Sequence, residues 1–66
     1  MITYLGRNRH GVAVTGARSE SLRGFVKRCY DQGWQRLTVS QDGREVGWIR
    51  KLADGKRVWW YDDTQT

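Results

Sequence analysis

The sequence contains one histidine and one cysteine, the two residue types that most often supply proton transfer or a nucleophile. His10 lies in a basic turn with no acidic residue close in sequence to orient its ring, so we expect it to be exposed. Cys29 falls on an apolar stripe, where a free cysteine behaves as a small hydrophobic residue. These two residues cannot supply the roughly four ligands of a structural zinc site, and no glycine-rich phosphate loop is present. The sequence therefore predicts a non-catalytic protein without metal, cofactor or small-molecule substrate.

Basic residues offer a different chemistry, the binding of a polyanion. The sequence contains twelve Lys and Arg residues and seven Asp and Glu residues, which gives a formal net charge of +5. Most are arginine, which binds phosphate in bidentate fashion, although a GC-rich genome enriches arginine equally well. A nucleic acid is thus one candidate partner. The candidate contacts lie in one loop and along one face of a helix: Arg7, Arg9, His10, Arg23, Lys27 and Arg28.

The helix that carries part of this charge is predicted over 20–32, within a segment 19–33 that includes its caps. Apolar residues recur there at helical spacing. Ser19 is the expected N-cap, Glu20 suits the first turn, and Gly33 suits the residue after the C-cap, with Trp34 packing back on the last turn. The stripe comprises Leu22, Phe25, Val26, Cys29 and Tyr30.

A three-stranded antiparallel meander is predicted over 34–63, with turns at Asp42-Gly43 and Asp54-Gly55. Two-residue loops at both turns predict one register. It directs an inner set toward the helix and an outer set away from it. If the second loop differs by one residue, the last strand flips and Trp59 and Tyr61 face outward. The inner set is Leu37, Val39, Val46, Trp48, Leu52, Trp59 and Tyr61; the outer set is Arg36, Thr38, Ile49, Lys51, Val58 and Trp60.

The outer set predicts a protein-interaction surface, because an outward Ile, Val and Trp leave more apolar area than a small monomer usually exposes. A chain of 66 residues has a small core and no disulfide, so burial of this face in a homodimer or against another protein would stabilise it. The N-terminal hairpin is the internal alternative cover. The candidate interface residues are Trp34, Arg36, Ile49, Lys51, Val58 and Trp60.

The N-terminal segment 1–18 is predicted to form that hairpin, with strands at 2–5 and 12–15 around a basic loop. It either extends the sheet or folds over its outer face. The whole sequence, 1–66, is expected to be one α+β domain, an amphipathic helix on an antiparallel sheet in the order ββαβββ. No stretch of about 18 apolar residues suggests a membrane span or a signal peptide, so we expect a cytoplasmic protein.

The segment 47–60, with its pattern G-W-I-x-x-x-x-D-G-K-x-x-W-W, resembles small accessory proteins of phages that infect actinobacteria. The resemblance implies a cytoplasmic protein made during infection that acts on DNA or on a host protein. It carries over no site residue. The αβββ portion also resembles double-stranded RNA-binding domains, but their second helix and basic motif have no counterpart in this sequence. We therefore expect a small basic binding module whose partner is a host protein or a nucleic acid, or which forms a homo-oligomer.

Overall fold

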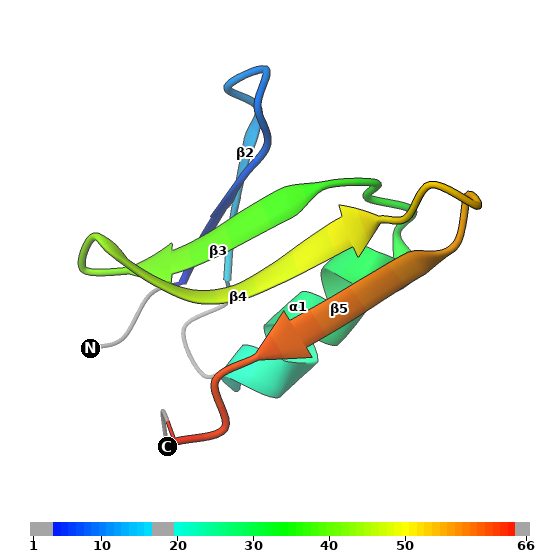
Figure 1. Cartoon of the computed structure of the whole chain (residues 1–66). Helices are drawn as coiled ribbons and strands as arrows, with labels where there is room; N and C mark the ends of the chain where they lie inside the picture. The colour runs from blue at the N-terminus through cyan, green and yellow to red at the C-terminus, as the bar shows by residue number, and fades with distance from the viewer. Residues whose placement is uncertain (1–3, 17–19, 65–66) are drawn as a thin grey trace.

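The computed structural model describes residues 4–16 and 20–64 (Figure 1). One helix covers one face of a five-stranded antiparallel sheet with the strand order β2-β1-β3-β4-β5, so the predicted α+β class and the ββαβββ order are confirmed. Among the described residues, no helix or strand covers the other face of the sheet (Figure 1), and we call it the outer face. The elements are β1 (Leu5–Arg7), β2 (Ala13–Thr15), α1 (Leu22–Asp31), β3 (Leu37–Gln41), β4 (Arg44–Lys51) and β5 (Arg57–Tyr61).

Helix α1 begins later than predicted because a different serine caps it. The Ser21 side chain accepts a hydrogen bond from the Gly24 N–H at 3.1 Å, which satisfies one of the free amides of the first turn. Glu20 therefore precedes the helix rather than occupying its first turn, and Ser19 lies outside the described residues.

The end of α1 agrees with the prediction. Gly33 has φ 96°, a left-handed conformation that glycine adopts without strain. The Gly33 N–H donates to the Tyr30 carbonyl and the Trp34 N–H to the Cys29 carbonyl, the paired bonds of a Schellman motif. Trp34 packs back against the core at this end of the helix.

The β3–β4 turn forms at Asp42-Gly43 as predicted, with positive φ at both residues and Gln41 opposite Arg44. Beyond it the predicted register is wrong. Ser40 faces Glu45 while Val39 faces Gly47, so Val46 is the extra residue of a β-bulge. The bulge reverses the predicted directions of the residues that follow it in β4. Ile49 is buried with 1% of its surface exposed, Trp48 lies on the outer face opposite Thr38, and Lys51, opposite Arg57, alternates to the same side as Ile49.

The β4–β5 loop is also longer than predicted. Leu52 donates to the Lys56 carbonyl across three residues that end in Gly55 at φ 88°, a common three-residue hairpin loop. Leu52 is consequently 46% exposed instead of inward. The two register errors cancel in β5, where Trp59 faces Ile49 and Trp60 faces Trp48. Trp59 and Tyr61 lie on the helix side and Trp60 on the outer face, as predicted.

The core lies between α1 and the inner face of the sheet, with Phe25, Val26, Val39 and Val46 fully buried. At Gly47 a Cβ would lie 3.0 Å from the Trp60 carbonyl oxygen and 3.1 Å from Val26 Cγ2, so the absence of a side chain lets the helix approach β4. The remaining buried members are Tyr4, Leu22, Cys29, Leu37 and Ile49.

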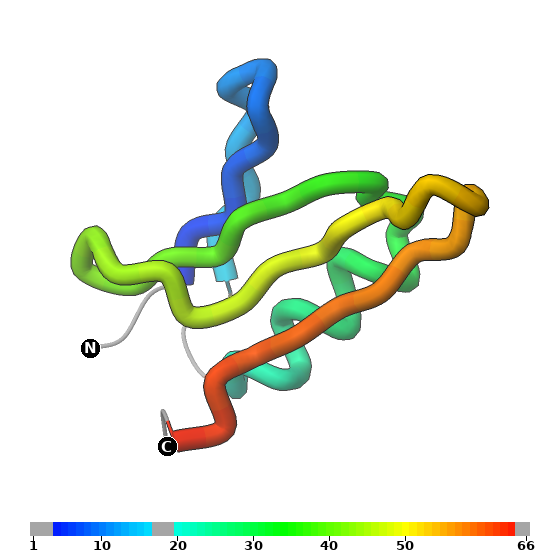
Figure 2. The backbone as a smooth tube through the Cα atoms, viewed as in Figure 1, coloured from blue at the N-terminus to red at the C-terminus, as the bar shows by residue number. Residues whose placement is uncertain are grey.

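The N-terminal hairpin extends the sheet, because β1 pairs with β3 as well as with β2. Strand β1 continues to Arg7, two residues beyond its predicted end, and β2 begins one residue later than predicted; residues 1–3, which include the start of the predicted first strand, lie outside the described part of the chain. The tip of the hairpin projects beyond the other strands (Figure 2). The hairpin therefore does not fold over the tryptophans of the outer face but stands beside them, and its basic loop borders that face.

Candidate nucleic-acid interface

A cleft on the outer face lies where the N-terminal hairpin meets β3 and β4. Strand residues Leu5, Thr38 and Trp48 form part of its lining. None of the described lining residues is an Asp or Glu. The cleft gathers five cationic side chains, and we call this set the cationic cleft: Arg7, Arg9, Arg36, Arg50 and Lys51.

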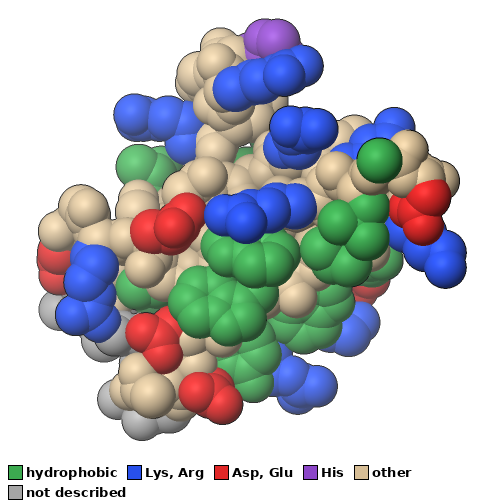
Figure 3. All heavy atoms as spheres, viewed as in Figure 1, with side chains coloured by type: hydrophobic (Ala, Val, Ile, Leu, Met, Phe, Trp, Pro, Cys, Tyr) green, Lys and Arg blue, Asp and Glu red, His purple; other side chains and the backbone are tan. Residues whose placement is uncertain are grey.

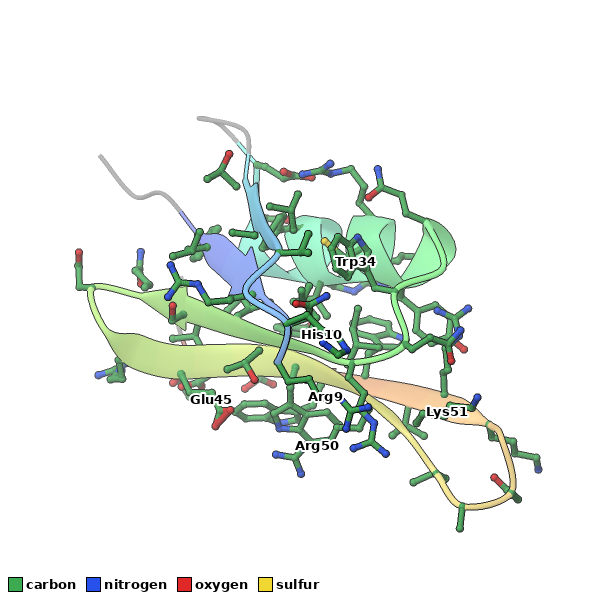
Figure 4. All side chains as sticks on the ribbon, turned by 90° about the horizontal axis from the view of Figure 1, so that it is seen from above. Arg9, His10, Trp34, Glu45, Arg50 and Lys51 are labelled. Atoms are coloured by element: carbon green, nitrogen blue, oxygen red, sulfur yellow. The ribbon has the colours of Figure 1, made fainter. Side chains whose placement is uncertain are left out.

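A second cleft adjoins the first and shares Arg9, Arg36 and Lys51 with it. It lies between the hairpin loop, which contributes His10, and the segment after α1, which contributes Trp34. Figure 4 shows Arg9 and His10 on the hairpin above the sheet, on the side toward Lys51 and Arg50. Cations from three separate segments of the chain thus surround one concave surface, which concentrates positive potential there.

The hairpin loop has a defined conformation set by Asn8. The Asn8 side-chain oxygen accepts hydrogen bonds from the His10 N–H at 2.9 Å and from the Val12 N–H at 3.0 Å. The Asn8 N–H in turn donates to the Val12 carbonyl. Asparagine favours such turns because its short side chain can bond the backbone two residues on. Asn8 therefore positions the loop that carries Arg9 and His10.

Arg57 holds the segment after the helix in place. Its Nη1 atom donates to the Tyr30 and Trp34 carbonyls, both at 2.8 Å. Its guanidinium lies 4.2 Å from the centre of the Tyr30 ring, and the Tyr30 hydroxyl donates to the Arg57 carbonyl at 3.3 Å. These contacts tie β5 to the end of α1 and thereby position the segment from Trp34 to Arg36.

Trp48 and Trp60 stack beside the cationic cleft, with ring centroids 5.9 Å apart and planes inclined by 28°; we call them the tryptophan pair. The Arg50 guanidinium lies 4.2 Å from the centre of the Trp48 ring and forms a cation–π contact with it. Trp60 remains 42% exposed. Figure 3 shows the apolar patch in the middle of this face, with basic side chains above it and both acidic and basic side chains below it.

The predicted nucleic-acid contacts on the helix do not line either cleft. Lys27 forms an ion pair with Asp31 at 2.9 Å, and Arg28 forms one with Glu20 at 2.8 Å. The hydrogen bond from Arg28 to Glu20 raises the pKa of Arg28 above its usual value. Arg23 is exposed on the helix. Of the predicted nucleic-acid contacts, only Arg7, Arg9 and His10 line the two clefts.

The predicted protein-interaction residues do not form one surface either. Ile49 is a core residue, and Trp34 is partly buried against the core, so neither forms an exposed outer patch. Val58 is half-buried and faces Arg50 across the β4–β5 pair. Arg36 and Lys51 line the cationic cleft and Trp60 belongs to the tryptophan pair. Sequence reasoning missed Trp48 and Arg50, because both depend on the unforeseen bulge.

The remaining chemistry is limited in the part of the chain that the structure describes. Cys29 is fully buried, and burial raises the pKa of its thiol above the usual value. No group of three or more His, Cys, Asp and Glu side chains among the described residues is arranged to hold a metal ion. None of the described residues forms a helix long and apolar enough to cross a membrane.

Comparison with known proteins returns no match: no family model, curated protein or solved structure is significantly similar to this chain.

Proposed function

We propose that the protein binds single-stranded nucleic acid on the outer face of its sheet. One observation carries the proposal: a concave surface lined by five cations and no described carboxylate adjoins an exposed, stacked pair of tryptophans. Phosphates are attracted to the cations, and bases stack on aromatic rings or on guanidinium planes.

The tryptophan pair favours a single strand over a duplex. Paired bases expose only their edges, whereas stacking on Trp60 or on the Arg50 guanidinium requires an open base face. The cationic cleft favours a nucleic acid over a second copy of this chain, because two copies that met cleft to cleft would bring like charges together. Repulsion between the clefts would oppose such a dimer.

The decisive experiment measures binding of a fluorescein-labelled oligothymidine by anisotropy at increasing salt. The wild-type protein is expected to bind at low salt and to lose affinity with a log–log slope of about −0.7 per phosphate contacted. The double variant Arg7→Ala/Arg9→Ala should reduce that slope by about 1.4, the share of two contacts. The matched double variant Arg23→Ala/Lys27→Ala also removes two positive charges, but from the helix, and should leave the slope nearly unchanged.

Trp60→Ala tests the stacking contribution separately. Trp60 lies outside the core, so the variant should fold, and its affinity should fall about 5- to 100-fold if one base stacks on it. Absence of binding at low salt, or tighter binding of a duplex than of the single strand, would overturn the proposal. Equal losses in the two double variants would show that only net charge matters.

A further inference from the structure

The outer face has a polarity along β4 that bears on which base it accepts. The outward residues follow in the order Glu45, Trp48 and Arg50, because the bulge turns both Val46 and Gly47 toward the core. Trp48 therefore lies between an acidic and a basic residue. In Figure 4, Arg50 and Arg9 lie close together, with Lys51 on one side of them and Glu45 on the other.

The Glu45 carboxylate is available to a ligand. It is exposed, and among the described residues none donates a hydrogen bond to it or forms an ion pair with it. Asp62 differs, since its carboxylate already accepts bonds from the Thr64 N–H and hydroxyl, which lower its pKa. Glu45 is thus an unpartnered acceptor on the same face of the sheet as the tryptophan pair.

A bound nucleotide has a matching polarity. The sugar and phosphate are attached on one side of the base, and the Watson–Crick edge lies on the opposite side. If the phosphates occupy the cationic cleft near Arg50 and the base stacks on the tryptophan pair, the Watson–Crick edge points toward Glu45. An ionised carboxylate only accepts hydrogen bonds, so that edge must present donors.

Guanine meets this requirement best among the four bases. Its N1–H and N2 amino group are adjacent donors that a carboxylate can accept in bidentate fashion. Thymine and uracil present one N–H between two carbonyl oxygens, which the carboxylate repels. On the basis of the proposed function, we infer that Glu45 is a specificity-determining residue that selects guanine for the position on the tryptophan pair.

The test compares labelled pentanucleotides TTTTT, TTGTT and TTITT, in which inosine keeps the N1–H but lacks the N2 amino group. The wild-type protein is expected to bind TTGTT about fivefold or more tightly than TTTTT, the lower part of the range for a bidentate base contact. TTITT should lie between them.

Glu45→Gln should reduce the preference for guanine to less than about twofold, because an amide can donate to thymine as well as accept from guanine. Asp42→Asn is the matched control: it also removes one negative charge and suits the left-handed turn position. It should retain the preference.

Equal binding of TTGTT and TTTTT by the wild-type protein, or a guanine preference that survives Glu45→Gln, would overturn the inference. In either case salt-dependent binding of TTTTT would still support the proposed function. Failure of every pentanucleotide to bind at low salt would overturn both.

Discussion

Among the described side chains outside the buried core, we expect the loss of Arg57 to destabilise the fold most. It bonds two carbonyls at the end of α1 and stacks on Tyr30. Each hydrogen bond from a charged, half-buried donor contributes about 1 kcal/mol, and the cation–π contact adds about 0.5–1 kcal/mol. Arg57→Ala should therefore reduce the free energy of unfolding by about 2–3 kcal/mol. A domain of this size has only about 3–5 kcal/mol in total.

The loss can be measured by urea denaturation followed by circular dichroism, and by the midpoint of thermal unfolding. At about 4–8 °C per kcal/mol for a small domain, the midpoint should fall by about 10–20 °C. Arg57→Met separates the contributions, because it retains the apolar stem and removes the donors. We expect it to lose about 2 kcal/mol, mainly from the two hydrogen bonds.

Arg23→Ala is the matched control, since Arg23 is an exposed arginine on α1, the helix whose end Arg57 contacts. Its stability should stay within about 0.5 kcal/mol of wild type. The reasoning would be refuted if Arg57→Met were as stable as Arg23→Ala, because the two carbonyl contacts would then contribute nothing net to the fold.

Three further changes have expected outcomes. Gly47→Ala should destabilise the fold by about 1–3 kcal/mol in urea titrations, because its Cβ would lie 3.0 Å from the backbone oxygen of Trp60; unchanged stability would contradict this close approach. Burial raises the pKa of the Cys29 thiol, so the buried neutral thiol stabilises the fold. This stabilisation is fully present below the pKa of the thiol in the unfolded chain, about 8.5, and is lost as the pH rises through the pKa in the folded protein. Cys29→Ala should therefore flatten the alkaline decline in unfolding free energy by at most about 1.4 kcal/mol per pH unit, and identical slopes would exclude the thiol as its cause. Asn8→Ala should speed hydrogen exchange of the His10 amide and weaken oligonucleotide binding while leaving the core intact; unchanged exchange would show that the loop keeps its conformation without the side-chain bonds.

The parts of the fold that local chemistry determines could be predicted from the sequence. The apolar stripe of α1 and the left-handed Gly33 follow from spacing and residue type. The turn at Asp42-Gly43 follows from the need for positive φ at two successive positions. In each case the residues that define the feature lie within a few positions of one another.

The register of β4 could not be predicted in the same way, because packing between residues that are distant in the sequence determines where a bulge forms. Regular alternation directed Trp48 inward and Ile49 outward. The structure instead places the smaller Ile49 under the helix and frees Trp48 for the outer face. The isolated Gly47 within the strand was the available signal, since a glycine in a strand often accompanies a bulge or a close backbone approach.

The same irregularity produces the candidate site. Without the extra residue Val46, strict alternation from Glu45 would place Gly47 and Ile49 outward and both Trp48 and Arg50 inward. Because Trp60 is the cross-strand partner of Trp48, the tryptophan pair would then turn inward, and the cationic cleft would lose Arg50. With the bulge, Glu45, Trp48 and Arg50 share one face, and the three-residue loop before β5 brings Trp60 opposite Trp48. The two departures from ideal hairpin geometry act together: neither alone would place Glu45, the Trp48–Trp60 pair and Arg50 side by side on the outer face.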